Sequence, residues 1–342
     1  MCFFLHIFEA TIFLYYILKN YSVKQYQEND YENWNAFIAQ AKNATFLFHR
    51  DFMEYHSDRF QDYSLIVLDG EKWVAVLPAN KVGDEVFSHQ GLTYGGLIYS
   101  DKVKLASVIE IFKSILFFLN SNKIEKVQLK LIPCIYHQKP ADELNYALFL
   151  VESKLIRRDS MAVVDLSHKL LIASGRKEGI KKGIVNKLEI KEVDGFQDFW
   201  DEILIPNLTL KHHAKPVHTL QEISKLKALF PKNIRQFNVY ENEIIVAGTT
   251  IFESENVAHS QYISGKEDKN ELGGLDFLHH YLLTEVVKEK KFFDFGVSNE
   301  ADGKKLNNGL SYWKESFGAR TIVQDFYEVK TINFAKLENV IK

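Results

Sequence analysis

Apolar and polar positions follow a regular order in the second half of the chain. Ile244–Thr250 and Asn256–Ser264 are rich in β-branched and aromatic residues, which predicts two strands. The pair Gly273-Gly274 then precedes an apolar stretch from Leu275 to Glu289, which we predict to be a helix. The short run Phe292–Phe295 after it is typical of a buried strand. The predicted order is therefore strand, strand, glycine turn, helix and strand.

The first half of the chain repeats this plan. Its segments are a hairpin (Ser64–Leu68 and Trp73–Leu77), a strand (Val86–His89), a glycine-rich stretch (Gly91–Gly96), a helix (Leu105–Leu119) and a strand (Val127–Leu131). The matching hairpin of the second half is Phe237–Tyr240 with Ile244–Thr250. Strands and helices do not simply alternate, so a doubly wound parallel sheet fits poorly. We predict an α/β (α+β) chain with two tandem modules, each a mixed, mostly antiparallel sheet flanked by helices.

The 342 residues are enough for two domains with separate cores. We place the first module at residues 21–165 and the second at residues 192–342. A basic connecting segment, residues 166–191, separates them, because Arg176–Gly183 interrupts the apolar pattern. This basic run is either a solvated linker or helix, or a site for a substrate phosphate.

The first twenty residues form an apolar N-terminal extension, residues 1–20. The stretch Cys2–Leu18 is mostly apolar and aromatic, but His6 and Glu9 interrupt it, and its uncharged parts are short for a bilayer span. It lacks the basic start and small-residue cleavage site of a secretory signal. In order of preference, we interpret it as an upstream start-codon extension, an extra helix packed on the first module, or a membrane anchor.

Composition and charge narrow the class of protein. Hydrophobic residues at 46% and charged residues at 25% are typical of a soluble globular chain. A net charge of −3 argues against a large nucleic-acid interface, which would need a basic excess. The two cysteines, Cys2 and Cys134, are too few for a disulfide framework, which suits a reducing, cytoplasmic compartment.

The chain contains several turns but few motifs of known chemistry. It has no nucleophile elbow, phosphate-binding P-loop, His-Glu-x-x-His or paired Cys-x-x-Cys, which argues against metal and covalent-serine hydrolase chemistry. A glycine turn at a helix N-terminus leaves backbone N–H groups free to bind an anion such as a pyrophosphate. Gly273-Gly274 is therefore either such a cradle or an ordinary glycine turn.

Several sequence blocks occur together in a recognisable order. They are Leu77–Asn80, Ser88–Gly96, Lys215–His218, His259–Ser264, Gly273–Asp276, Phe293–Gly296, Asn299-Glu300, Leu306–Leu310 and Lys314–Gly318. With these blocks the chain, over about Tyr21–Val329, resembles the acyl-CoA N-acyltransferase (GNAT) superfamily in its FemAB-like double-module form. Within that group it looks most similar to enzymes that acylate an amino group on a nucleotide-linked (dTDP) amino sugar. One departure is that Ser264–Glu271 is longer and more mixed in charge than the superfamily's pyrophosphate loop.

The resemblance implies a reaction and its substrates. An acyl-CoA co-substrate would bind the C-terminal module, and the amino group of a nucleoside-diphosphate-linked amino sugar would attack the acyl carbonyl directly to form an amide. The product would serve surface polysaccharide biosynthesis in the cytoplasm. No metal, nucleic acid or membrane partner is implied. Such a reaction needs an oriented amine, a stabilised oxyanion and a proton acceptor such as a histidine or carboxylate.

The matching positions supply candidate residues for each role. The candidate proton acceptors are His89, His218 and Glu300. The candidate substrate-binding residues are Tyr94, Gly95, His259 and Asn299. The candidate cofactor-binding residues are Ser264, Gly265, Gly273, Gly274, Asn308 and Lys314. Each histidine could equally be a hydrogen-bonded structural residue, Tyr94 could be core packing, and Lys314 could be a solvated helix lysine.

Two other functions fit the same sequence. One keeps the fold but uses an aminoacyl-tRNA as the donor for a peptide bridge. The other is a module that binds a sugar nucleotide or a partner without catalysis. The acyl group, the sugar, the general base, the module that holds CoA and the oligomeric state are not set by the sequence.

Overall fold

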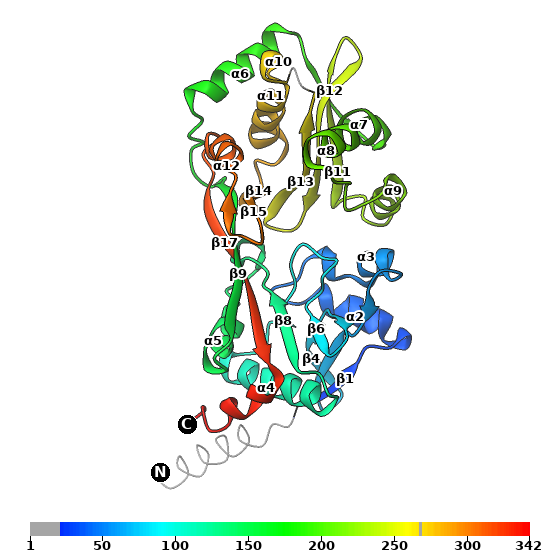
Figure 1. The fold of residues 1–342 in the computed structure, drawn as a ribbon, viewed down its shortest axis with the longest axis vertical. Coiled ribbons are helices and arrows are strands. Elements are labelled where there is room, and N and C mark those ends of the chain that lie inside the picture. The colour runs from blue at the N-terminus through cyan, green and yellow to red at the C-terminus, as the bar shows by residue number, and fades with distance from the viewer. Residues whose placement is uncertain (1–20, 267–268) are drawn as a thin grey trace, which may run out of the picture. The chain divides into compact units, whose positions relative to one another are not determined.

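The computed structural model describes residues 21–266 and 269–342. These residues form two compact units, one made of the chain up to Ile156 together with Phe326–Lys342, the other of Arg157–Asp325. The two unit boundaries fall inside two long strands, β9 (Lys154–Asp165) and β17 (Arg320–Lys330). These strands are neighbours in the sheet order (Figure 1). The predicted extension, residues 1–20, lies outside the described residues.

The first unit contains two β-sheets and a long helix. Its remaining elements are β1 (Ser22–Gln25), η1 (Glu28–Asp30), α2 (Tyr31–Ile38), η2 (Phe46–Phe48), α3 (Arg50–Met53), η3 (Glu54–His56), β2 (Gln61–Asp62), β3 (Leu65–Asp69), β4 (Lys72–Leu77), β5 (Asn80–Val82), β6 (Glu85–Phe87), β7 (Ile98–Tyr99), α4 (Leu105–Ser121), β8 (Lys126–Lys130), η4 (Cys134–Tyr136), α5 (Glu143–Leu150) and η7 (Thr331–Leu337). One sheet has the order β1-β3-β4-β7, and in the other β17 is followed by β8, β6, β5 and β2. Strands β6 and β8 run parallel and are joined through α4.

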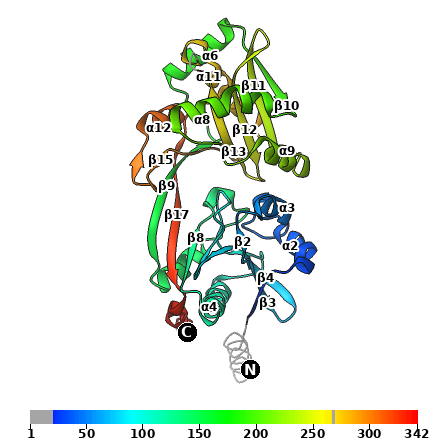
Figure 2. The same ribbon diagram turned by 45° about the vertical axis from the view of Figure 1, so that its right-hand side comes forward.

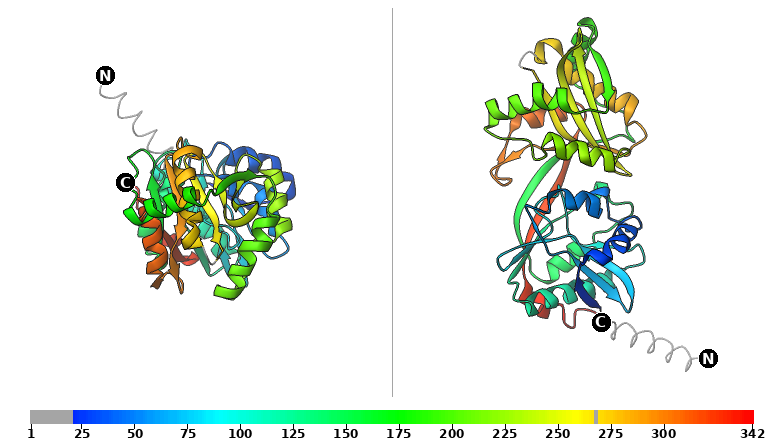
Figure 3. Two further views of the ribbon diagram at one scale, coloured as in Figure 1. Left: turned by 90° about the horizontal axis from the view of Figure 1, so that it is seen from above. Right: turned by 90° about the vertical axis from the view of Figure 1, so that its right-hand side faces the viewer.

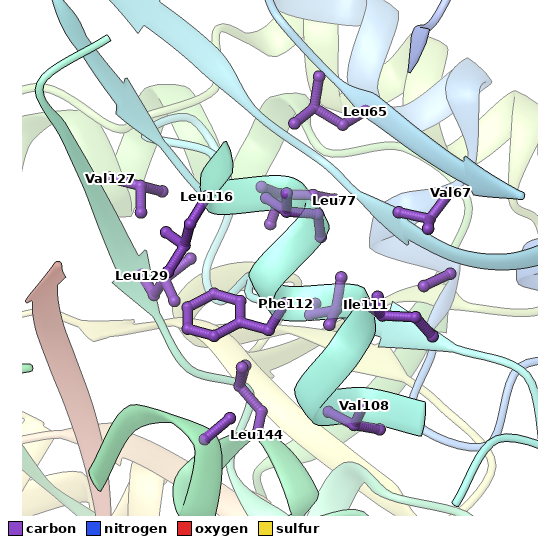
Figure 4. Close-up of a cluster of buried hydrophobic side chains, with 14 of the residues drawn as sticks. Leu65, Val67, Leu77, Val108, Ile111, Phe112, Leu116, Val127, Leu129 and Leu144 are labelled. Atoms are coloured by element: carbon purple, nitrogen blue, oxygen red, sulfur yellow. The ribbon is translucent and has the colours of Figure 1, made fainter. Parts of the chain in front are cut away.

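The core of the first unit lies around α4. This helix is apolar on most of its surface, and Ile111, Phe112 and Leu116 are buried on it. They belong to the same cluster as Leu65 of β3 and Val127 of β8 (Figure 4). Burying such side chains contributes about 1.5–3 kcal/mol each, so this cluster is the main source of stability of the unit.

The last part of the chain belongs to the first unit, which differs from our predicted boundary at residues 166–191. Strand β17 pairs antiparallel with β8, from Phe326↔Lys130 to Lys330↔Lys126. After it, Phe334 of η7 packs edge-on against Phe117 of α4, with ring centroids 5.2 Å apart. The C-terminal end of the chain accordingly lies beside the elements of the first unit (Figure 3). The prediction assigned these residues by chain order, and order alone does not show that a strand returns to an earlier sheet.

The second unit contains one mixed sheet with helices packed on it. Its remaining elements are α6 (Ser174–Val185), β10 (Glu189–Val193), α7 (Gln197–Phe199), η5 (Trp200–Leu204), α8 (Ile205–His212), α9 (Leu220–Leu229), β11 (Ile234–Glu241), β12 (Ile244–Glu253), β13 (Val257–Gly265), α10 (Lys269–Leu272), α11 (Gly274–Tyr281), η6 (Leu282–Val286), β14 (Phe292–Val297), β15 (Asn299–Glu300), β16 (Lys305–Leu306) and α12 (Asn308–Glu315). The sheet order within the unit is β10-β11-β12-β13-β14-β9. Figure 2 labels β10, β11, β12 and β13 of this sheet. All neighbours are antiparallel except β13 and β14, which are parallel and joined through α11.

The two units share one local plan, which confirms the predicted fold class. Each has an antiparallel hairpin, β3–β4 or β11–β12, followed by a strand, a crossover helix and a parallel strand. The crossover helix is α4 in the first unit and α11 in the second. The helix predicted to continue to Glu289 changes to π-type turns in η6 after Tyr281. The mixed, mostly antiparallel sheets flanked by helices are as predicted.

The predicted basic connecting segment is a packed helix of the second unit. Helix α6 lies in direct contact with the start of α11, because glycines occupy the contact face. A Cβ atom on Gly179 would lie 1.9 Å from Asp276 Oδ2, and one on Gly183 would lie 2.6 Å from Phe277 Cβ. The lysines of this helix led us to predict a solvated linker. Glycines at every fourth position, including Gly179 and Gly183, are instead typical of close helix packing.

One further finding concerns membranes. Among residues 21–266 and 269–342, none of the helices combines the length and the apolar character needed to cross a bilayer.

Substituting the glycines of α6 tests this packing. We expect Gly183→Ala to lower the free energy of unfolding by about 1–3 kcal/mol, because the new methyl group would overlap Phe277 Cβ. Gly175→Ala is the matched control, since nothing lies within 4 Å of its Cβ position. It should leave stability unchanged or raise it by about 0.4–1 kcal/mol. Urea unfolding measures both, and equal effects of the two substitutions would contradict the contact.

Candidate functional site

Strands β13 and β14 begin as a parallel pair and then separate. They are paired only from Val257↔Phe292 to His259↔Asp294. Beyond His259, β13 continues to Gly265 with β12 as its only strand neighbour in the described part of the chain. The backbone from Ser260 to Gly265 therefore has an edge without a strand partner on the side of β14. Such an edge offers N–H and C=O groups to a ligand.

A β-bulge interrupts each strand where they separate. On β13, Thr250↔Tyr262 is followed by Ile251↔Ser260, so Gln261 is an extra residue. On β14, the pairing with β9 shifts between Asp294 and Val297. Bulges bend a strand and redirect its side chains, and they are common beside active sites. The two bulges lie next to the same point of the sheet.

A histidine and a carboxylate meet at this point. His259 Nδ1 lies 2.9 Å from Asp294 Oδ2, and the other carboxylate oxygen accepts a hydrogen bond from Gly296 N at 2.7 Å. Asp294 is fully buried, whereas the His259 side chain is 12% exposed. Since an ionised carboxylate only accepts hydrogen bonds, Nδ1 is the donor in this contact, and Nε2 is the ring nitrogen that is left to exchange a proton with a substrate. Nε2 has no hydrogen-bond partner among the residues that the structure describes.

A buried lysine fixes the bulge on β14. Lys314 of α12 is 3% exposed, and its Nζ donates to the carbonyl oxygens of Gly296 at 3.0 Å and Val297 at 2.7 Å. Burial lowers the pKa of Lys314 to about 8, and the nearby Asp294 charge acts in the opposite direction. Gly296 has a φ of +73°, and a Cβ there would lie 3.2 Å from His259 Cε1. The lysine thus holds a glycine bulge against the histidine ring.

The predicted site residues near this point differ in their surroundings. Asn299 accepts hydrogen bonds from Ser160 N at 2.6 Å and Ser160 Oγ at 2.8 Å, so its amide oxygen ties β9 to the loop after β14. Glu300 is exposed and accepts from Asn307 Nδ2 at 3.1 Å. Asn308 is exposed as the first residue of α12. By contrast, His259 contacts the Asp294 carboxylate, and Lys314 contacts the carbonyls of the adjacent bulge.

Other predicted residues of the second unit have structural partners. His218 is 4% exposed, and its Nδ1 lies 2.7 Å from the hydroxyl of Tyr262. Ser264 Oγ and Gly265 O both accept from Asn207 Nδ2 of α8 at 2.8 Å. His218 is therefore buried away from solvent, and the end of β13 at Ser264-Gly265 is held by Asn207 of α8.

The predicted residues of the first unit lie in packed surroundings. His89 is 3% exposed and stacks on His56, and its Nδ1 accepts from Gly91 N at 3.2 Å. Burial, with a smaller contribution from His56, lowers the pKa of His89 to about 3. Tyr94 is also buried and donates to Thr45 Oγ1 at 3.0 Å. The His89 ring therefore has almost no contact with solvent, and its lowered pKa disfavours the uptake of a proton.

Gly95 explains why the first unit has no equivalent open edge. Strand β6 ends at Phe87, opposite Gln128 of β8. Beyond it, Gly95 N donates to Lys130 O at 2.7 Å, and Gly95 forms a parallel bridge with Leu131. The glycine-rich loop therefore fills the space beside β8. A Cβ on Gly95 would lie 1.6 Å from Ser88 O, which accounts for the glycine.

The predicted cradle at Gly273-Gly274 is covered, which corrects our expectation of free N–H groups at the start of α11. Both glycines are buried. A Cβ on Gly273 would lie 2.1 Å from Gly179 O of α6. The prediction treated this turn in isolation, and it missed that α6 packs on it. Within the described residues there is also no group of three His, Cys, Asp or Glu side chains that could bind a metal ion.

Asp294 is a candidate functional residue that the sequence analysis did not single out. It was included in the predicted buried strand Phe292–Phe295 without a role. A carboxylate inside a run of phenylalanines is costly to bury without a partner, so the sequence did contain a signal. His259, which we predicted to bind substrate, is the hydrogen-bond partner of this buried carboxyl group.

Comparisons with known proteins place the fold. No protein-family model and no curated protein matches the sequence. Among solved structures, the chain is similar to FemX, with a TM-score of 0.63 and 9% identity over 93% of this chain and 99% of that chain. It is also similar to L-PGS from Bacillus licheniformis, with a TM-score of 0.55 and 10% identity over 84% and 94% of the two chains.

A third similar structure is a tandem GNAT protein from the clavulanic acid biosynthesis pathway. Its TM-score is 0.51, with 10% identity over 91% of this chain and 99% of that chain. Identities this low concern the fold and not the substrates. The protein has a FemAB-like fold of two GNAT-type modules.

Proposed function

We propose that the protein is an N-acyltransferase that forms an amide by direct attack of an amine on an activated acyl group. The observation that carries this proposal is the pair His259–Asp294 at the open edge of β13. It combines a histidine, oriented by a buried carboxylate, with a strand edge that can bind an extended substrate. The double GNAT-type fold supports the same class of reaction.

The chemistry follows from the positions of these groups. The amine nitrogen of the acceptor attacks the acyl carbonyl carbon and forms a tetrahedral intermediate. His259 Nε2 takes the proton that the nitrogen loses, and the Asp294 carboxylate stabilises the imidazolium that results. The C–S or C–O bond to the carrier then breaks, and the histidine returns the proton to the leaving sulfur or oxygen. No covalent enzyme intermediate is needed.

The oxyanion of the intermediate needs hydrogen-bond donors that are already in place. Backbone N–H groups on the unpaired edge of β13, beside the bulge at Gln261, meet this requirement. Lys314 stabilises the β14 strand across from this edge, because it donates hydrogen bonds to the carbonyls of Gly296 and Val297. It thereby keeps the bulge, and with it the His259 ring, in one position.

The proposed substrates follow the sequence resemblance. The acceptor is the amino group of a nucleoside-diphosphate-linked amino sugar, and the donor to test first is an acyl-CoA. A second candidate donor, an aminoacyl-tRNA, is favoured by one observation, the α6 cover over the expected pyrophosphate cradle. Both donors present an acyl carbonyl to the same amine, so they share the chemistry above.

The proposal is tested by product formation. Purified protein is incubated with a panel of acyl-CoA esters or charged tRNA and with dTDP-linked amino sugars, and amide products are detected by mass spectrometry. We expect one donor class to give an acylated sugar nucleotide. Binding of a sugar nucleotide without any amide product, across both donor classes, would favour the non-catalytic module instead.

Substitutions of the buried pair should separate catalysis from binding. We expect His259→Gln and Asp294→Asn each to lower kcat by about 10²–10⁴-fold, because general base catalysis contributes this much. The matched control is His168→Gln, since His168 forms an exposed pair with Asp165 at 3.2 Å. Steady-state kinetics measures all three. Full activity of His259→Gln would exclude the histidine as the proton acceptor.

Lys314 gives a prediction for the pH dependence of stability. Its folded pKa of about 8 lies below the ordinary value of 10.5, so the unfolded chain binds more protons between these values. The stability of the wild type, relative to Lys314→Met, should therefore rise from about pH 7.5 to about pH 10, by on the order of 3 kcal/mol. Urea unfolding at several pH values measures the difference. A difference that stays constant would show that Lys314 titrates normally.

A further inference from the structure

The first turn of α11 already contains an anion. Asp276 is the third residue after the N-cap position Gly273 and is 8% exposed. Its carboxylate oxygens lie 2.7 and 2.9 Å from Arg176 Nη1. Trp313 Nε1 donates to the same carboxylate at 2.9 Å. Three helices, α6, α11 and α12, thus meet at one buried carboxylate.

This carboxylate has the role that a bound phosphate has at other helix N-termini. The positive end of a helix dipole favours a negative charge in the first turn. Here Asp276 supplies that charge, and Arg176 from α6 neutralises it. A second anion at this position would meet a carboxylate of the same sign, and it would have to displace the Gly179 carbonyl that contacts Gly273.

We propose that Asp276 is a specificity-determining residue that excludes a diphosphate from the N-terminus of α11. The donor is then recognised through its acyl-bearing arm along the open edge of β13, and the nucleotide diphosphate of CoA contributes little to binding. This inference rests on the proposed acyl transfer at His259. It names the chemical class of donor that the site selects, an acyl ester or thioester held by its arm.

The contacts of Asp276 connect this exclusion to the reaction site. Trp313 precedes Lys314 in α12, and Lys314 holds the bulge beside His259. An external diphosphate that displaced Asp276 from Trp313 would therefore disturb the helix that carries Lys314. Exclusion of external anions from the N-terminus of α11 therefore also preserves the position of Lys314 beside His259.

The first experiment does not depend on activity. Inorganic pyrophosphate and adenosine 3′,5′-bisphosphate are titrated into wild type and Asp276→Asn, and the melting temperature is followed, since a ligand of the folded state raises it. We expect no pyrophosphate stabilisation of the wild type at millimolar concentration. The substitution leaves the Arg176 charge uncompensated and should tighten pyrophosphate binding by about tenfold or more, which corresponds to about 1.4 kcal/mol.

The experiment includes one control variant and one replacement variant. Glu178→Gln removes an exposed carboxylate of α6 next to Gly179 and should leave pyrophosphate binding unchanged. If Asp276→Asn does not fold, Asp276→Ser is titrated in its place. Micromolar pyrophosphate binding to the wild type that Asp276→Asn strengthens would overturn the exclusion. Absence of pyrophosphate binding in the folded Asp276 variant would overturn the assignment to Asp276 and leave α6 alone as the cover.

The second experiment compares two donors. The wild type is assayed with an S-acyl-pantetheine and with the corresponding acyl-CoA, which differ by the nucleotide and its phosphates. We expect the two kcat/KM values to lie within about tenfold of each other, which corresponds to about 1.4 kcal/mol. A bound diphosphate would favour acyl-CoA by more than this ratio. A preference for acyl-CoA above about a thousandfold would overturn the inference while the proposed function stands. Turnover of neither ester, nor of charged tRNA, would refute the proposed function, and the pyrophosphate titration would still decide the role of Asp276.

Discussion

A carboxylate with no access to water must be neutralised or hydrogen-bonded, and this constraint on Asp294 organises the second unit. The residue lies on β14, at the last position where β14 still pairs with β13. His259 and the Gly296 amide satisfy its two oxygens. Those contacts require a glycine bulge on β14, and the bulge exposes carbonyls that Lys314 then satisfies. The contacts around one buried carboxyl group thereby connect β13, the bulge of β14 and α12.

The two units have the same order of elements but differ at the edge of the strand that precedes the crossover helix. Both have a crossover helix between parallel strands, but the first unit fills the space beyond β6 with the loop that contains Gly95. In the second unit, the edge of β13 after His259 has no such cover in the described residues. The same order of elements therefore gives a filled edge in one unit and, in the other, the open strand edge where we propose the reaction. Duplication alone would not have distinguished them.

Much of the fold could be predicted from the sequence, but little of the site. Period-two and apolar patterns identified the hairpins, α4, β8 and β14, because those patterns report burial along a single element. The role of α6 and the return of β17 to the first unit depend on contacts between distant segments, which local patterns do not contain. For the same reason the sequence did not show that His89 and the turn Gly273-Gly274 are buried by packing. Asp294 was the exception, since its signal was local and was overlooked.

The return of β17 has a consequence for synthesis on the ribosome. The first unit is interrupted by the whole of the second, and its final strand, from Phe326 onward, is made last. Until that strand emerges, β8 has an exposed edge, whereas the residues of the second unit are already complete. The inserted unit can thus become native during translation, and the unit that begins first is finished after it.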